Sequence, residues 1–232
     1  MEVVEKDFQA FEQLLRLVNI SVLGAPLCYC YDGENNNEKQ LKPSYSHLSK
    51  LIDYVSNKGH SDKPENNINR KELYSGDTNA LKRAHDELEE NYASLSASSK
   101  EWYIFEGFTN PDIFIEGDDY IIVCEGKWTE PNITTHTTHL PCRSQMVRHI
   151  QGALNYSDKK VCAFYIVDSE FGKEYLKNLT KDALEKQLSQ ETIKLENEEV
   201  KKILDAFYGY TTWQDIHEAI PSVRFKSKNE IE

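Results

Sequence analysis

The sequence lacks any apolar run of the roughly 20 residues that a transmembrane helix needs. A secretory leader is not evident either, because the first residues are acidic and amphipathic and are not basic followed by apolar. No internal repeat is visible. These absences predict a cytoplasmic protein that makes no membrane contact.

An excess of basic residues is also missing. The 232 residues include 27 Lys and Arg against 39 Asp and Glu, which gives a net charge of −12. A protein that coats nucleic acid usually carries net positive charge, so the composition argues against broad electrostatic binding. Phosphate contacts need only a local patch, which this composition allows. The hydrophobic share of 39% is large enough for a folded core and argues against global disorder.

Cysteines are few and scattered. Their number, five, is odd, and without a leader we expect reduced thiols. Cys28 and Cys30 are too close together for a zinc knuckle and have no companion pair, so we interpret them as small residues of a strand. Cys124 and Cys142 lie in no nucleophile motif, and no Gly-x-Ser-x-Gly elbow occurs. A Cys or Ser hydrolase is therefore not indicated.

The N-terminal part of the chain is predicted to consist of helices joined by loops. Apolar residues recur at helical spacing over residues 2–19, 43–56 and 79–95. A short strand is expected at residues 27–31. The polar, breaker-rich stretch 57–77 is expected to be a mobile connector.

The pattern changes to β-type runs after residue 100. Strands are predicted at residues 102–108, 112–116 and 120–127, and the last two are joined by a turn at Gly117-Asp118-Asp119. Ile121, Ile122 and Val123 form a continuous apolar run, which is typical of a strand covered on both faces. This region is therefore expected to be the buried centre of the fold.

A crossover unit is predicted to follow. A helical pattern over residues 142–156 precedes an uncharged strand over 161–167, and a strand–helix–strand order places the two strands side by side. Residues 170–220 are expected to form a charged helical cover with a frayed tail after residue 224. Three parts are expected within one structural domain: an N-terminal lobe over 1–100, a core over 101–168 and a C-terminal extension over 169–232.

Three charged side chains are predicted to converge at the hairpin. Asp112 follows Pro111 on one strand, and Glu125-Gly126-Lys127 lies on the next. Glu125 and Lys127 are two residues apart, so they face the same side of a strand. Charges beside an apolar run are costly unless they are paired or bind a metal. Two carboxylates and an ammonium therefore predict a site for Mg²⁺, with Mn²⁺ able to substitute.

The order Pro111-Asp112, turn, Glu125-x-Lys127 resembles the PD-(D/E)XK nuclease superfamily, and the resemblance covers residues 102–167. It implies an α/β, restriction endonuclease-like fold: a small mixed β-sheet flanked by helices, here with an N-terminal helical lobe and C-terminal helices. It further implies a bacterial, metal-dependent nuclease, an endonuclease or an exonuclease, that hydrolyses DNA with a magnesium-activated water. Asp112 and Glu125 would bind the ion, and Lys127 would orient the water or neutralise developing charge. Endonucleases of this fold often pair, so a homodimer is also expected.

Two more residues are candidates for this site. Related nucleases place a Gln, and sometimes a Tyr four residues later, on the helix after the motif. Gln145 matches the first of these, whereas His149 stands where the Tyr would be and so departs from the second. The alternative interpretation of Gln145 is a solvated helix residue. Glu12 interrupts an apolar stripe, which indicates either a rim position or a further metal-binding carboxylate.

Residues 131–157 contain no Asp or Glu. The same stretch supplies hydroxyl, imidazole and guanidinium donors, as a phosphate backbone requires, and so predicts a path for nucleic acid. Its candidate contacts are His136, His139, Arg143 and Arg148. A rival reading of His136, His139 and Cys142, each three apart, is a zinc site, although no fourth ligand is obvious.

A non-catalytic binding module or partner-protein subunit on the same fold is the alternative function. The acidic composition favours it slightly. The complete set of Asp112, Glu125 and Lys127 argues against it, because a module without chemistry has no need of all three.

Overall fold

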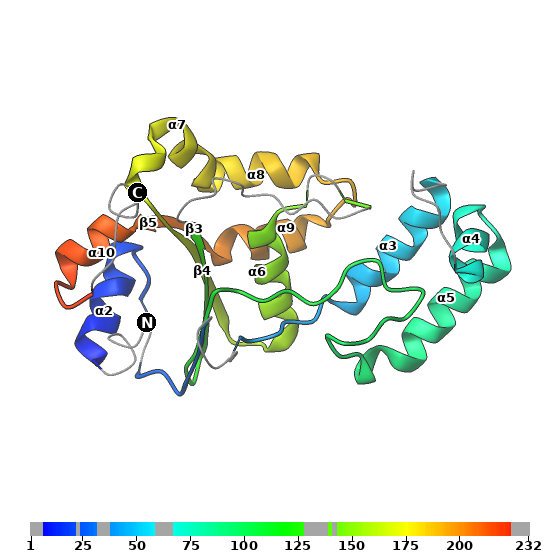
Figure 1. The fold of residues 1–232 in the computed structure, drawn as a ribbon, viewed down its shortest axis with the longest axis horizontal. Helices are drawn as coiled ribbons and strands as arrows, with labels where there is room; N and C mark the ends of the chain where they lie inside the picture. The colour runs from blue at the N-terminus through cyan, green and yellow to red at the C-terminus, as the bar shows by residue number, and fades with distance from the viewer. Residues whose placement is uncertain are drawn as a thin grey trace.

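A five-stranded mixed sheet forms the centre of the molecule (Figure 1). The computed structural model describes residues 7–21, 24–31, 38–58, 67–127, 139–140 and 143–223. The strands follow each other in the sheet in chain order: β1 (Cys28–Tyr31), β2 (Ile113–Glu116), β3 (Tyr120–Lys127), β4 (Lys160–Val167) and β5 (Phe207–Thr212). β2 runs antiparallel to both of its neighbours, β1 and β3, whereas β3, β4 and β5 run parallel.

The predicted hairpin joins β2 and β3. Ile113 pairs with Cys124 and Ile115 pairs with Ile122 across it. The turn is closed by the Gly117 N–H, which donates to the Tyr120 carbonyl at 3.0 Å. A Cβ atom at Gly117 would collide with the Tyr120 ring, so this turn requires glycine.

The crossover unit is confirmed as well. Helix α6 (Gln145–Tyr156) links β3 to the parallel strand β4. Its N-terminus is capped by the Ser144 hydroxyl, which accepts a hydrogen bond from the Val147 N–H. Its first residue, Gln145, accepts a hydrogen bond from Lys127, so the first turn of α6 lies close to the carboxyl end of β3.

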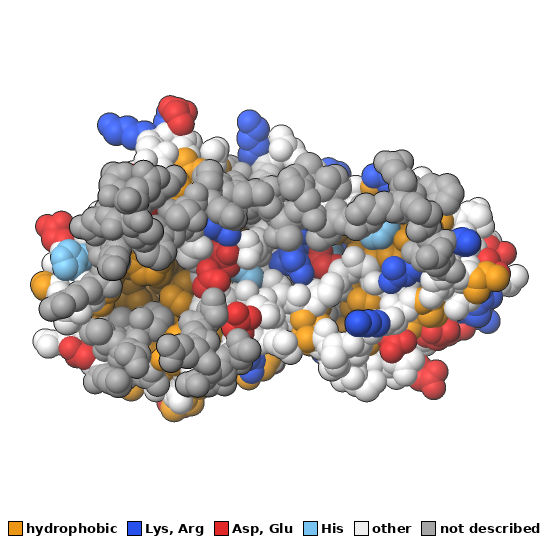
Figure 2. All heavy atoms as spheres, in the orientation of Figure 1, with side chains coloured by type: hydrophobic (Ala, Val, Ile, Leu, Met, Phe, Trp, Pro, Cys, Tyr) orange, Lys and Arg blue, Asp and Glu red, His pale blue; other side chains and the backbone are white. Residues whose placement is uncertain are grey.

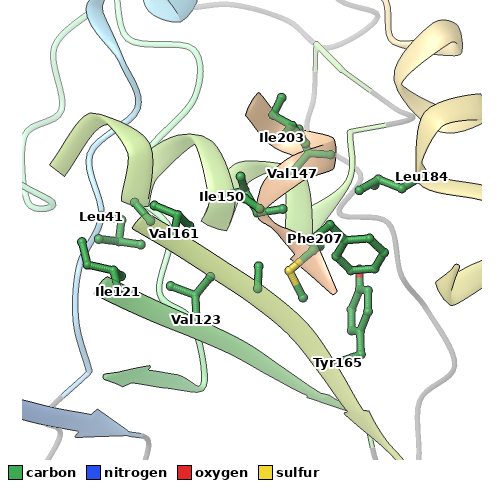
Figure 3. Close-up of a cluster of buried hydrophobic side chains, with 14 of the residues drawn as sticks. Leu41, Ile121, Val123, Val147, Ile150, Val161, Tyr165, Leu184, Ile203 and Phe207 are labelled. Atoms are coloured by element: carbon green, nitrogen blue, oxygen red, sulfur yellow. The ribbon is translucent and has the colours of Figure 1, made fainter. Parts of the chain in front are cut away.

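Helices cover both faces of the sheet. On one face, α6, α8 (Lys181–Gln190) and α9 (Asn197–Ala206) pack against Ile121, Val123 and neighbouring apolar side chains (Figure 3). On the other face, α2 (Phe8–Leu17) and α10 (Trp213–Ala219) pack against Ile122 and Cys124. Because side chains alternate along β3, Glu125 and Lys127 belong to the face that α6 covers.

A helical lobe extends from one end of this core (Figure 1). It consists of α3 (Tyr45–Lys58), α4 (Ile68–Tyr74) and α5 (Thr78–Asn91), which enclose an apolar cluster of their own. The remaining short elements are η1 (Tyr92–Ser94), η2 (Ser169–Phe171), α7 (Lys173–Leu176) and η3 (Lys177–Leu179).

The strand predicted at residues 102–108 is wrong. The segment is irregular, and Trp102 and Tyr103 are buried in the lobe cluster. Arg70 holds this shape, because its guanidinium donates to the carbonyls of Trp102 and Ile104 at 2.6 and 3.2 Å. Large aromatic residues here fill a helical core and do not pair with a strand.

Three further expectations are corrected. Within the connector predicted at 57–77, the structure contains α4, capped by the Asn67 side chain. The C-terminal cover also contains β5, which extends the sheet beside β4. The lobe is smaller than residues 1–100, because β1 pairs with β2 and α2 packs on the sheet.

The coarse fold prediction is confirmed: the chain is α/β, with a mixed sheet flanked by helices. In the part of the chain that the structure describes, no helix combines the length and the apolar character of a membrane span. The frayed tail predicted after residue 224 lies outside the described residues.

Candidate active site

Asp112 and Glu125 lie opposite each other at the open end of the β2–β3 hairpin. The register that pairs Ile113 with Cys124 brings Asp112 across from Glu125. The Gly126 N–H donates to Asp112 Oδ2 at 2.7 Å. A Cβ atom at Gly126 would lie 3.3 Å from the same oxygen, so glycine gives the carboxylate room to approach the strand.

Both oxygens of the Glu125 carboxylate accept hydrogen bonds. Lys127 Nζ donates to Oε1 at 2.7 Å, and His149 Nε2 donates to Oε2 at 2.9 Å. Lys127 Nζ also donates to Gln145 Oε1 at 3.0 Å. Gln145 and His149 are one turn apart on α6, so a single helix face supports both charged residues of β3.

The two carboxylates have opposite electrostatic environments. Burial and the Glu125 charge raise the pKa of Asp112, against the opposing effects of Gly126, Lys127 and His149. Burial alone would also raise the pKa of Glu125, but its hydrogen bond and electrostatic interaction with His149, together with the charge of Lys127, lower it below its ordinary value. Glu125 is thus stabilised as an anion, whereas ionised Asp112 lies in an unfavourable field that a cation would relieve.

The donor set fits a hard divalent cation. Mg²⁺ is commonly held by one or two protein carboxylates, with waters and substrate phosphates as the other ligands. Asp112 and Glu125 supply that number. Among the described residues no group of three or more His, Cys, Asp or Glu side chains could hold a metal ion, so the ion would depend on phosphate and water for its remaining ligands.

Two phenols that the sequence patterns do not indicate lie within electrostatic range of Glu125. Burial and the charge of Glu125 raise the pKa of Tyr175 to about 12 and raise that of Tyr165 further. The Tyr175 hydroxyl is buried, and no described group accepts or donates a hydrogen bond to it. It is therefore a neutral O–H donor held within the electrostatic range of the site.

Glu12 is not brought to this centre. It is exposed on α2, which covers the sheet face opposite to Glu125. The rim position was one of the two expectations for Glu12, and the structure agrees with it.

The expected nucleic-acid contacts are arranged differently from the prediction. Arg143 is only 2% exposed and is paired with Glu106 and Glu191, so its guanidinium is not available to a phosphate. The Arg148 guanidinium donates to the carbonyls of Gly107 and Phe108 at 3.2 Å each. The sequence could not reveal these partners, because Glu106 and Glu191 are remote from Arg143 along the chain.

The remaining members of that stretch lie elsewhere or are not described. His139 packs against the rings of Tyr74 and Phe105 in the lobe. His136 and Cys142 lie outside the described residues, so the zinc reading of His136, His139 and Cys142 stays a hypothesis. The space-filling view shows acidic, basic and histidine side chains together in the middle of one face, between core and lobe (Figure 2).

Cys124 has no nucleophilic character. It is fully buried, and burial raises its pKa well above the ordinary value of a thiol.

Comparisons with protein-family models, curated proteins and solved structures found no match to this chain. The functional conclusion therefore depends on the geometry of the site and on its motif.

Proposed function

We propose that this protein is a metal-dependent nuclease that hydrolyses phosphodiester bonds in nucleic acid, with DNA as the expected substrate. The observation that supports this most is the local geometry. Asp112 lies opposite Glu125, and Lys127 is held between Glu125 and Gln145. Two carboxylates and one oriented ammonium are the groups that metal-assisted phosphodiester hydrolysis requires.

The proposed roles follow from the contacts. Asp112 and Glu125 would hold the divalent ion, which supplies Lewis-acid activation of the phosphate and of an attacking water. Lys127 has three N–H donors, of which two bind Glu125 and Gln145. The third can donate to the attacking water or to a non-bridging phosphate oxygen, where negative charge increases in the transition state.

The resemblance to the PD-(D/E)XK motif supports a polynucleotide as the substrate. The net charge of −12 indicates that substrate binding depends on local contacts at the site and its lobe. The interior position of Arg143 removes one of the phosphate contacts that the sequence suggested.

Cleavage of labelled DNA and RNA, single- and double-stranded, in Mg²⁺ and in Mn²⁺, tests the proposal. We expect Lys127→Ala to lower the cleavage rate by about 100-fold or more, the effect typical of losing one donor to a transition-state charge. Lys201→Ala is a matched control, because Lys201 is exposed on α9. If wild type and Lys127→Ala behave alike on every substrate with both metals, the non-catalytic module becomes the better account.

A further inference from the structure

A buried chain of hydrogen bonds leads from Thr109 to Glu125 through His149. Thr109 Oγ1 is 2.8 Å from His149 Nδ1, and His149 Nε2 is 2.9 Å from Glu125 Oε2. His149 is 0% exposed and Thr109 is 6% exposed. Both ring nitrogens of a fully buried imidazole are therefore directed, one toward the candidate site and one away from it.

The backbone fixes Thr109 at the outer end of this chain. Its N–H and carbonyl group pair with Leu41 at 3.0 and 2.9 Å, in an isolated antiparallel bridge. Gly152, three residues beyond His149, lets this bridge approach α6: a Cβ atom there would lie 2.8 Å from Leu41 Cβ and 3.5 Å from Thr109 Cγ2. Thr109 is thus held against the helix that carries His149.

The direction of the hydrogen bonds follows from the chemistry of the groups. A carboxylate only accepts, so His149 Nε2 carries the proton that Glu125 Oε2 binds. The Thr109 hydroxyl can then donate to the lone pair of Nδ1, which favours the Nε2–H tautomer and fixes the plane of the ring.

From this geometry we infer that His149 is a positioning residue for Glu125, and that the Thr109 hydroxyl orients His149. The inference rests on the proposed function, in which Glu125 is a metal ligand. Hydrogen bonds to a ligand from groups that do not touch the metal fix the ligand's orientation, and their loss typically weakens metal binding by about 10- to 100-fold. The Nε2–H donor would hold Oε2 in place while the other lone pairs of Glu125 face the ion.

Mn²⁺ binding without nucleic acid, followed by the electron paramagnetic resonance signal of free Mn²⁺, tests this inference. Thr109→Val has nearly the same shape and removes the hydroxyl, whereas Thr109→Ser keeps it. We expect Thr109→Val to raise the Mn²⁺ dissociation constant by about 10-fold or more and Thr109→Ser to restore near wild-type binding. His149→Phe, which keeps a ring and removes both hydrogen bonds, should weaken binding at least as much.

A second readout separates orientation from simple packing. ¹⁵N NMR of the imidazole should show the Nε2–H tautomer for His149 in wild type and Thr109→Ser, and a loss of this preference in Thr109→Val.

Equal Mn²⁺ affinity in wild type and Thr109→Val would overturn the inference and leave the proposed nuclease function standing. If Mn²⁺ binding depends on Thr109 but no nucleic acid is cleaved, the positioning role is supported and the nuclease proposal fails. If wild type and Asp112→Asn bind Mn²⁺ equally weakly, both are overturned.

Discussion

At the scale of residues, the candidate site combines well-satisfied hydrogen bonds with an unfavourable charge. Glu125, Lys127, Gln145 and His149 satisfy one another directly. Asp112 is different, because burial and the neighbouring Glu125 raise its pKa. A group whose pKa is raised on folding binds its proton more tightly in the native state, so ionisation of Asp112 at neutral pH lowers stability.

Asp112→Asn should therefore melt at a higher temperature than wild type in EDTA at pH 7.5. The amide oxygen of Asn can still accept from the Gly126 N–H, while the repulsion from Glu125 disappears. Added Mg²⁺ should raise the melting temperature of proteins that keep Asp112 and should not raise that of Asp112→Asn, since a ligand present at 100 times its dissociation constant stabilises by about 2.7 kcal/mol. Asp118→Asn, in the exposed turn, is the control. Equal Mg²⁺ shifts in all three proteins would contradict this assignment.

The sequence predicted part of this residue set. The sequence allowed Asp112, Glu125 and Lys127 to be predicted, because the hairpin turn and the two-residue strand period determine which side chains meet. Gln145 followed from the resemblance. Thr109 was not predicted, because its contact with His149 depends on an isolated bridge to Leu41 that no local pattern encodes.

At the scale of elements, α6 organises the site. It carries Gln145 and His149 on one face, and Gly152 brings it close to the Leu41–Thr109 bridge. Its apolar side chains, including Val147 and Ile150, pack on the sheet (Figure 3). Small displacements of this helix would therefore move both groups that contact Glu125 and Lys127.

Gly152→Ala tests this dependence. Alanine favours a helix over glycine by about 1 kcal/mol. Here the new Cβ would meet Leu41 Cβ at 2.8 Å, and overpacking of this kind costs about 1–3 kcal/mol. We expect urea denaturation to show a net loss of stability, whereas the control Gly107→Ala, with no atom within 4 Å of its Cβ, should be neutral or stabilising. Increased stability of Gly152→Ala would mean that α6 can shift without cost.

Elements with a strong local period were predictable, and others were not. β3, β4 and α6 have apolar patterns that define them without tertiary information. β5 has a mixed burial pattern and contains Gly209 at φ 83° where its register against β4 shifts, so it lacks the alternation of an ordinary strand. Its place in the sheet is determined by packing beside β4.

At the scale of the whole molecule, a buried ion cluster joins the lobe, α6 and the C-terminal helices. Glu106 accepts hydrogen bonds from Arg143 and lies 3.2 Å from His47 Nε2 of α3. Arg143 also pairs with Glu191, which follows α8, at 2.8 Å. These charges come from four separate parts of the chain, so each depends on the others for its burial.

Arg143→Met should destabilise the protein by about 3–5 kcal/mol, because it leaves two buried carboxylates without their cation. Chemical denaturation followed by circular dichroism measures this loss. Arg16→Met, at an exposed position of α2, should have little effect. A small effect at Arg143 would show that Glu106 and Glu191 find other partners.

The same cluster predicts a pH dependence. Burial opposes ionisation of Glu106, but Arg143 and His47 hold its pKa well below the ordinary value of a glutamate. A depressed pKa gives stability that is present above the unfolded-state pKa of about 4.3 and is lost as the pH falls toward the folded-state value. The stability difference between wild type and Glu106→Gln should thus be largest near pH 7 and shrink below pH 4. Urea titrations at pH 7, 5 and 3.5 measure it, and a constant difference would exclude this role of Glu106.

The most direct test of the central claim is the position of Mn²⁺ in a crystal of the wild-type protein, located by anomalous scattering. The nuclease proposal predicts one ion bound directly by oxygens of Asp112 and Glu125, at close to the roughly 2.0–2.1 Å of magnesium–oxygen ligation. The ion should be absent from crystals of Asp112→Asn grown and soaked in the same way. A wild-type crystal saturated with Mn²⁺ that shows no ion between these carboxylates would contradict the account.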